Sequence, residues 1–210
     1  MGKVIFKITQ ALMNWCERNG RIFKITGTAG PDDVYLIRYY VIKSKYFNFF
    51  VHQFLRSDRD DLHDHPWDFC TYLVSGAYKE RKYNQKTGKV DEIVRYNKED
   101  ADMISSDGLG NVKHTPIPLK KNTFVFRKAT DQHQVLVFRD LKESQKDQAA
   151  TTLFFSGPTK REWGFIKEEM QDIPCPDGIA GCAVRHMKRV RKWIKWTTYL
   201  GLPDNTKSRG

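Results

Sequence analysis

Eight short runs of aromatic and β-branched residues between Val34 and Phe155 restrict the fold more than any other feature. Each run has the length of a strand, and turn formers such as Asn84, Gly88 and Gly157 separate many of them. The runs are Val34–Ile42, Tyr46–Leu55, Trp67–Ser75, Ala77–Tyr83, Asp91–Tyr96, Asn122–Arg127, Gln132–Arg139 and Thr151–Phe155. This pattern favours a sandwich, a jelly roll or a small barrel over a parallel sheet with crossover helices.

The two ends of the chain have helical patterns instead. Apolar residues at helical spacing predict a helix within residues 1–20 that packs on the main domain, residues 34–165. Residues 183–200 predict a basic amphipathic helix, and residues 204–210 a flexible tail. The apolar stripe of the second helix comprises Val184, Met187, Val190, Ile194 and Thr197. Polar residues 97–121 and 140–149 indicate loops, and the first is long enough to be a lid or to contain a short strand.

Composition excludes several classes of protein. With 40% hydrophobic and 13% aromatic residues, the 210-residue chain is typical of a packed globule. Its four cysteines are too few for a disulfide scaffold. Charged residues interrupt the N-terminus, so no signal peptide is predicted, and no apolar run approaches the ~18 residues that span a bilayer. We therefore expect a reduced, cytoplasmic protein.

The formal net charge of +11 favours anionic partners: nucleic acid, phosphorylated small molecules or an acidic membrane surface. The basic side chains of the predicted C-terminal helix could follow a nucleic-acid backbone or lie on an anionic membrane. These side chains are Arg185, Lys188, Arg189 and Lys192. Alternatively, the apolar stripe docks on the main domain or on a second copy of the chain and leaves the charges in water.

Histidines supply the strongest functional signal. His63 and His65 lie in the run from Leu62 to Phe69, which reads as a strand. On a strand they would share one face, about 7 Å apart, and both could reach one metal ion. A third histidine, His133, begins a later strand-like run. Three convergent histidines predict a metal site with open positions for water or ligand, whereas a lone histidine would be interpreted as an ordinary polar residue.

These residues resemble the cupin superfamily, whose fold is a small jelly-roll barrel. His63, His65 and Gly76 fall in the register of its first motif, and His133 matches the histidine of its second motif. Two departures stand out: Phe69 takes the place of the usual glutamate, and the proline and glycine that precede the second-motif histidine are missing. The resemblance implies a mainly β, double-stranded β-helix, to which the short helices predicted from the periodicity at both ends would be added.

Four short patterns are more narrowly similar to a little-characterised cupin group from bacteria and phages. They are His63-Asp64-His65-Pro66-Trp67, Gly76-x-Tyr78-x-Glu80, Phe126-Arg127-x-Ala129-x-x-x-His133 and Gly157-Pro158-x-x-Arg161-x-Trp163-Gly164-Phe165. Cupins include metal-dependent dioxygenases, sugar-phosphate isomerases and non-enzymatic ligand binders. By ligand type the three histidines favour Fe²⁺ or Zn²⁺, and they also suit Mn²⁺ or Ni²⁺.

Other residues are candidates for the same site. Glu80 is predicted as a displaced acid ligand or general base, with a structural ion pair as the alternative. Arg127 would clamp a carboxylate or phosphate, unless it makes a salt bridge at the barrel rim. His52 is a candidate pocket residue. Arg161 and Trp163 would either cap the barrel mouth or pack against its outside.

Alternation along the strand also predicts where the neighbours of the histidines point. Phe69 has the parity of His63 and should face the interior, which would make one side of the pocket apolar. Asp64 and Asp68 have the opposite parity. Either could orient a ligand histidine, and the alternative is a solvent-facing or loop-stabilising carboxylate.

The sequence thus predicts a metal-binding cupin that binds or converts a small polar or anionic metabolite, with dioxygenase and isomerase chemistry both open. Two alternatives remain. One is a non-catalytic cupin that sequesters a nucleotide-like or other anionic ligand. The other is a nucleic-acid-associated protein that uses its basic C-terminal segment.

Overall fold

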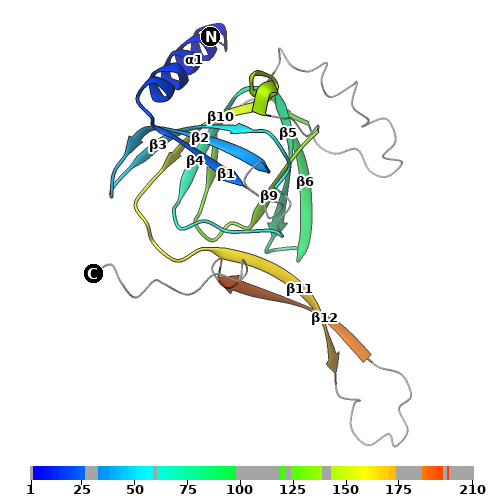
Figure 1. Cartoon of the computed structure of the whole chain (residues 1–210). Coiled ribbons are helices and arrows are strands. Elements are labelled where there is room, and N and C mark those ends of the chain that lie inside the picture. The colour runs from blue at the N-terminus through cyan, green and yellow to red at the C-terminus, as the bar shows by residue number, and fades with distance from the viewer. Residues whose placement is uncertain are drawn as a thin grey trace, which may run out of the picture.

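The computed structural model describes residues 2–26, 33–58, 61–97, 119–121, 124–138, 143–173, 186–195 and 198. Strands predominate, with one long helix at the N-terminus (Figure 1). In chain order the elements are α1 (Gly2–Arg18), β1 (Ile22–Thr26), β2 (Val34–Lys43), β3 (Asn48–Phe54), β4 (Phe69–Ser75), β5 (Ala77–Asn84), β6 (Lys89–Tyr96), β7 (Leu119–Lys121), β8 (Val125–Arg127), β9 (His133–Val137), the 3₁₀ helix η3 (Glu143–Gln148), β10 (Ala150–Ser156), β11 (Gly164–Ile173) and β12 (His186–Lys195). Each of the eight predicted runs overlaps one of these strands.

Two sheets face each other and curve around a shared interior (Figure 1). One has the strand order β1-β2-β3-β10-β4-β8 and the other β7-β6-β5-β9. Neighbouring strands are antiparallel except for β6 and β7. Strands distant in sequence pair within each sheet, as β3 does with β10. The fold is therefore the mainly β jelly roll that the sequence predicts.

Strand alternation divides side chains between the interior and the outer face. Phe50 of β3, Phe69 of β4 and Phe154 of β10 form one buried cluster, with Tyr40 and Trp67 packed against it. Val51, the next residue along β3, belongs to a different buried cluster on the opposite face of the sheet. The aromatic residues that favour strands thus also fill the interior.

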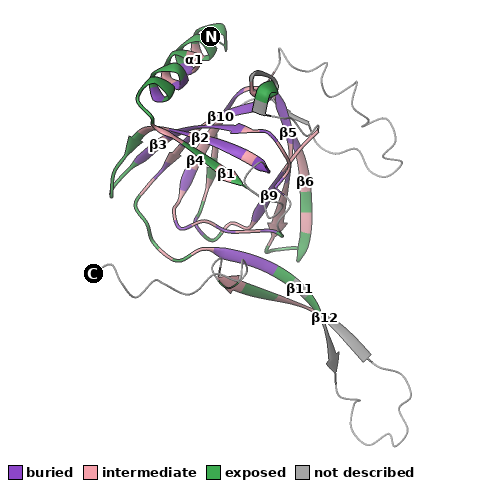
Figure 2. Ribbon diagram, in the orientation of Figure 1, coloured by how far each residue is buried: buried purple, intermediate pink, exposed green. Residues whose placement is uncertain are grey.

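The C-terminal half of helix α1 packs on the outer face of the larger sheet. Its residues Met13 and Cys16 are buried in a cluster with Tyr39, Val51 and Leu55 of the sheet region. Figure 2 shows the remainder of the helix mostly exposed. Among the described residues, no helix is long and apolar enough to cross a membrane.

Gly76 turns the chain between β4 and β5. Its φ of 79° lies in the left-handed region that favours glycine. An added Cβ would also lie 2.8 Å from the Cα of Ala150 on β10. This glycine therefore permits both the tight turn and the close approach of the neighbouring strand.

The prediction of a C-terminal helix is wrong over residues 186–195, which form strand β12. Ten residue pairs join β12 to β11 in an antiparallel ribbon that extends beyond the barrel (Figure 1). The guanidinium of Arg191 lies 4.0 Å from the ring centroid of Tyr83 on β5. Pairing with a complete partner strand outweighs the local helical periodicity. The other residues of that predicted helix and tail lie outside the described residues, apart from Thr198.

Three further strands did not stand out in the sequence. They are β1, β7 and β11. Strand β7 lies at the end of the long segment, residues 97–121, that was predicted as a loop, a lid or a short strand. Residues 98–118 of that segment lie outside the described residues. Most of the second predicted loop is the 3₁₀ helix η3.

Candidate metal centre

The segment that contains His63 and His65 is a loop, not the strand that the sequence predicted. Strand β4 begins only at Phe69. His63 makes single-residue bridges to His133 and Phe165, and its backbone exchanges hydrogen bonds of 3.0 and 2.9 Å with that of His133. The backbone N–H of His65 donates to Ala129 (3.2 Å). These bonds hold the loop beside β9 without regular strand geometry.

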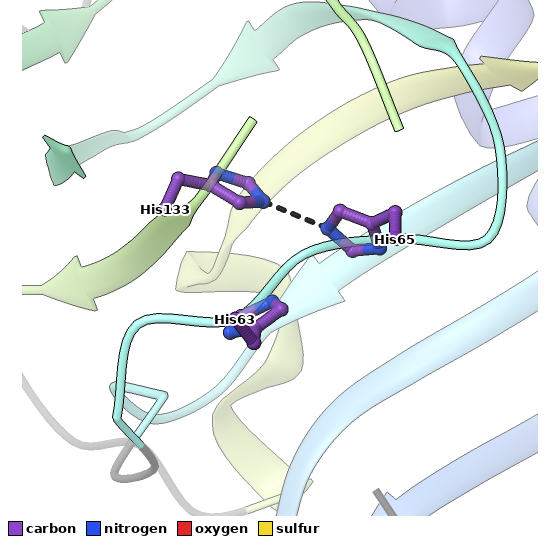
Figure 3. A group of neighbouring side chains, drawn as sticks. All are labelled: His63, His65 and His133. Carbon is purple, nitrogen blue, oxygen red and sulfur yellow. Dashed lines mark hydrogen bonds between the residues drawn. The ribbon is translucent and has the colours of Figure 1, made fainter. Parts of the chain in front are cut away.

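All three predicted histidines nevertheless converge (Figure 3). Each offers one ligand atom, and these atoms lie within 4.8 Å of one another. The Nε2 atoms of His65 and His133 are 2.7 Å apart. Ring centroids are separated by 5.0 Å for His63 and His65, 5.1 Å for His63 and His133, and 5.0 Å for His65 and His133. The three rings form a nearly equilateral cluster, a donor set that suits a divalent transition metal.

Two of the histidines have a carboxylate beside their second ring nitrogen. Oε1 of Glu80 lies 3.2 Å from Nδ1 of His133, and Oδ2 of Asp58 lies 3.0 Å from Nδ1 of His63. The first contact has hydrogen-bond geometry and fixes the ring orientation and tautomer of His133, which leaves its Nε2 to coordinate, whereas the second lies at ion-pair distance without that geometry. Both carboxylates are buried. The residues present therefore fit a bound metal ion.

Glu80 makes structural ion pairs, which was the alternative to its being an acid ligand or a general base. Its carboxylate accepts from Nε of Arg95 (2.7 Å) and from Nη2 and Nε of Arg127 (2.7 to 3.1 Å). Burial alone would raise the pKa of Glu80, but the contact with His133 and the two guanidinium groups hold it well below its usual range. In this arrangement its two oxygens contact Arg95, Arg127 and His133.

Arg127 is engaged by the protein itself. Besides its bonds to Glu80, its Nη1 donates to the carbonyl of Phe126 (3.1 Å). The bidentate fork predicted to clamp a ligand is thus occupied by Glu80.

His65 and His133 are held in the form that coordinates metals. Burial, followed by the neighbouring His133 and His63, lowers the pKa of His65 well below its usual value. Burial also lowers the pKa of His133, although its contact with Glu80 acts in the opposite direction. Neutral imidazole is the ligating form, so burial prepares both rings for a cation.

Aromatic rings border the cluster on one side. Phe69 faces the interior as predicted, with its ring centroid 4.6 Å from that of His65 and 5.6 Å from that of His133. It also stacks on Phe154 at 4.9 Å. The ring of Trp163, a predicted site residue, lies 6.4 Å from that of His63. Phe69 and Phe154 are both buried, so the surroundings of His65 are apolar on this side.

Asp64 stabilises the loop from its other face. It is almost fully buried, where the sequence allowed a solvent-facing carboxylate. Its Oδ1 accepts from the backbone N–H of Gly164 (2.8 Å), and its Oδ2 accepts from Nε1 of Trp193 (2.9 Å) and lies 3.0 Å from Nη1 of Arg161. Arg161 therefore belongs to this junction between the loop and the β11–β12 ribbon.

Asp68 has a similar but more exposed position at the end of the loop. It accepts from the backbone N–H of Ala129 (2.8 Å) and pairs with Lys160. Both aspartates therefore match the loop-stabilising alternative.

Sequence reasoning missed Arg38 and Asp58. Arg38 on β2 pairs in register with His52 on β3, and its Nε donates to Nε2 of His52 (3.0 Å). Burial and the charge of Arg38 lower the pKa of His52 well below its usual value. The ring of His52 packs 4.8 Å from that of Phe154, outside the converging trio. Only the register between two strands reveals the Arg38–His52 pair.

Comparisons with known proteins identify no family. No protein-family model matches this chain, and no curated protein does. The solved structures that resemble it include Fe(II) HppE in complex with substrate (TM-score 0.39, 10% identity, 64% of this chain), of which this chain spans about half, 55%. Another is a cupin-2 domain from Rhodospirillum rubrum, with a TM-score of 0.41 and 9% identity over 69% of this chain and 73% of the other. A third is an RmlC-like cupin from Shewanella frigidimarina, with a TM-score of 0.36 and 10% identity over 66% of this chain and 86% of the other. Likenesses at this level do not determine the activity of this chain.

Proposed function

We propose that this protein is a metal-binding cupin in which His63, His65 and His133 hold a divalent transition-metal ion. The observation that carries the proposal is the convergence of three imidazoles whose ligand atoms lie within 4.8 Å of one another. Carboxylates beside two of these rings add independent support. Fe²⁺ or Zn²⁺ suits the ligand type best, and Mn²⁺ or Ni²⁺ is also compatible.

The bound ion would supply Lewis-acid or redox chemistry at coordination positions that the three histidines leave open. The chain itself supplies the surroundings. Glu80 orients the ring of His133, Asp58 borders that of His63, and Phe69 limits access of water. The ligand we propose is a small polar or anionic metabolite, converted by an oxygenase-like or isomerase-like reaction.

Alanine variants of the three histidines test the metal site. His63→Ala, His65→Ala and His133→Ala should each weaken metal binding by more than the roughly 10–100-fold typical of changes to residues that only orient a ligand. His186→Ala, at the start of β12, is the matched control. Metal content of untagged protein is measured by elemental analysis. Unchanged content in all three variants would refute the proposal.

A binder without turnover would use the same site. Stoichiometric metal and tight binding of a small oxyanion, with no conversion of it, would favour that function over an enzyme. Steep salt dependence of RNA or DNA binding would instead favour nucleic-acid association.

A further inference from the structure

Three arginines contact residues of the barrel interior, and their charges are balanced differently. Arg95 and Arg127 share the carboxylate of Glu80. Arg38 is half-buried, and no carboxylate of the described residues pairs with it. Its charge is therefore the one that this interior does not neutralise. A charge withdrawn from water and left unpaired is costly, and a ligand of opposite charge would offset that cost.

The protein nevertheless fixes the orientation of the Arg38 side chain. Its Nε donates to Nε2 of His52, and its guanidinium carbon lies 5.1 Å from the ring centroid of Phe50. With Nε engaged, the edge formed by the two Nη groups makes no hydrogen bond to any described residue. That edge is the part of a guanidinium that binds a carboxylate or phosphate with two parallel bonds.

A continuous layer of rings connects Arg38 with the histidine cluster. The ring of Phe50 lies 6.1 Å from that of Phe154, which in turn lies 6.4 Å from that of His65. The charge of Arg38 also acts on His65. Arg38 and the histidines therefore border the same interior.

We propose that Arg38 binds the carboxylate or phosphate group of a small metabolite whose second oxygen donor coordinates the metal held by the three histidines. This inference rests on the proposed metal site and adds the class of ligand: a small oxyanion with two donor groups. It also moves the anion-binding function from Arg127, whose fork Glu80 occupies, to Arg38.

Calorimetric titration of untagged protein with malonate and with inorganic phosphate tests the inference. Each anion is titrated into zinc-loaded and metal-free forms of the wild type, Arg38→Gln and Arg38→Lys. A charge-assisted hydrogen bond is worth about 1.5–3 kcal/mol, so Arg38→Gln should weaken binding by roughly 10–100-fold. Arg38→Lys keeps the charge but loses the fork, and should give an intermediate affinity. The preferred anion distinguishes a carboxylate from a phosphate ligand.

Arg81→Gln is the matched control. Arg81 lies on β5 in contact with Glu92 and Gln134, and its side chain is 39% exposed. This variant should bind both anions like the wild type. Melting curves establish that each variant is folded. If Arg38→Gln does not fold, equal affinities of Arg38→Lys and the wild type would overturn the inference.

Metal analysis of the same samples separates this inference from the proposed function. Normal metal content with anion affinity unchanged in Arg38→Gln would overturn the inference and leave the metal site intact. Failure of the wild type to bind either anion in either form would also overturn it. Anion binding that depends on Arg38 in a protein unable to hold metal would support the Arg38 contact and refute the metal site.

Discussion

Glu80 and Asp64 are two buried carboxylates near the histidine cluster, and they act differently. Glu80 lies within regular strand β5, where it contacts two guanidinium groups and the ring of His133. Asp64 lies in the loop between His63 and His65, where it accepts from a backbone N–H and an indole N–H of the β11–β12 ribbon. Glu80 therefore balances charge and orients one ring, whereas Asp64 fixes the position of the loop backbone.

The difference shows that a site of three histidines depends on two kinds of support. On the strand side, the antiparallel ladder fixes the backbone, and the remaining requirement is electrostatic because Arg95 and Arg127 both pair with Glu80 there. On the loop side, charge matters less than position, since the loop lacks a regular hydrogen-bonded ladder. Substitutions of the two carboxylates should therefore differ in size and in kind.

The largest effect is expected for Glu80→Gln. It leaves Arg95 and Arg127 buried without a compensating charge, which typically lowers the free energy of unfolding by about 3–5 kcal/mol. Urea unfolding of the metal-free protein measures the loss. Glu92→Gln is the matched control: that side chain is 35% exposed and pairs with Lys79 and Arg81 at 3.5 and 3.4 Å. Its loss should cost about 1 kcal/mol or less. Similar small losses for both variants would contradict a special role for Glu80.

Asp64→Asn should have the next largest effect on stability. Asparagine cannot accept from all three partners, so we expect a loss of about 1–3 kcal/mol in the free energy of unfolding. Asp68→Asn is the control, because its side chain is 46% exposed. Urea unfolding should show the smaller loss for Asp68→Asn, and the reverse order would contradict the assignment of Asp64 as the main support of the loop.

Asp58→Asn should act mainly on metal affinity. Asp58 borders Nδ1 of His63, and loss of such an orienting carboxylate typically weakens metal binding by about 10–100-fold. Competition with a chromophoric chelator measures the affinity. Wild-type affinity in this variant would show that loop position alone orients His63.

The smallest expected effect is on the pH dependence of the free energy of unfolding. The folded state lowers the pKa of His52, so below its usual value of 6.5 the unfolded chain binds more protons than the native protein. Stability should therefore fall as the pH decreases through this value and level off below the folded-state pKa. Replacing His52 by Gln should flatten this slope by at most about 1.4 kcal/mol per pH unit. Urea unfolding of the metal-free protein across this range measures the slope. An unchanged slope would contradict a buried, neutral His52.

The strand pattern predicted a sandwich, a jelly roll or a small barrel, because the same aromatic residues favour strands and fill the interior, and the cupin resemblance selected the jelly roll among these. The sequence also predicted the convergence of His63, His65 and His133, although by an argument that assumed a strand where a loop exists. His63 and His65 converge because backbone bonds to His133 and Ala129 hold that loop. The histidine spacing was therefore informative even though its geometric explanation was wrong.

What the sequence could not supply depends on pairing between distant segments. The partners of Glu80 come from β6, β8 and β9, and the Arg38–His52 contact requires the register of β2 against β3. The C-terminal segment shows the same limit. Its helical periodicity was genuine, yet β11 pairs with it along its whole described length. Local patterns predict elements, whereas networks of charges depend on which elements meet.

X-ray absorption spectroscopy of the zinc-loaded protein tests the central claim most directly, because imidazole rings give a characteristic multiple-scattering signal. We expect nitrogen ligands at about 2.0–2.1 Å, with scattering from about three imidazoles in the wild type and about two in His133→Ala. His186→Ala should match the wild type. A zinc environment without imidazole scattering, or one unchanged by His133→Ala, would contradict the assignment of these three histidines as the metal ligands.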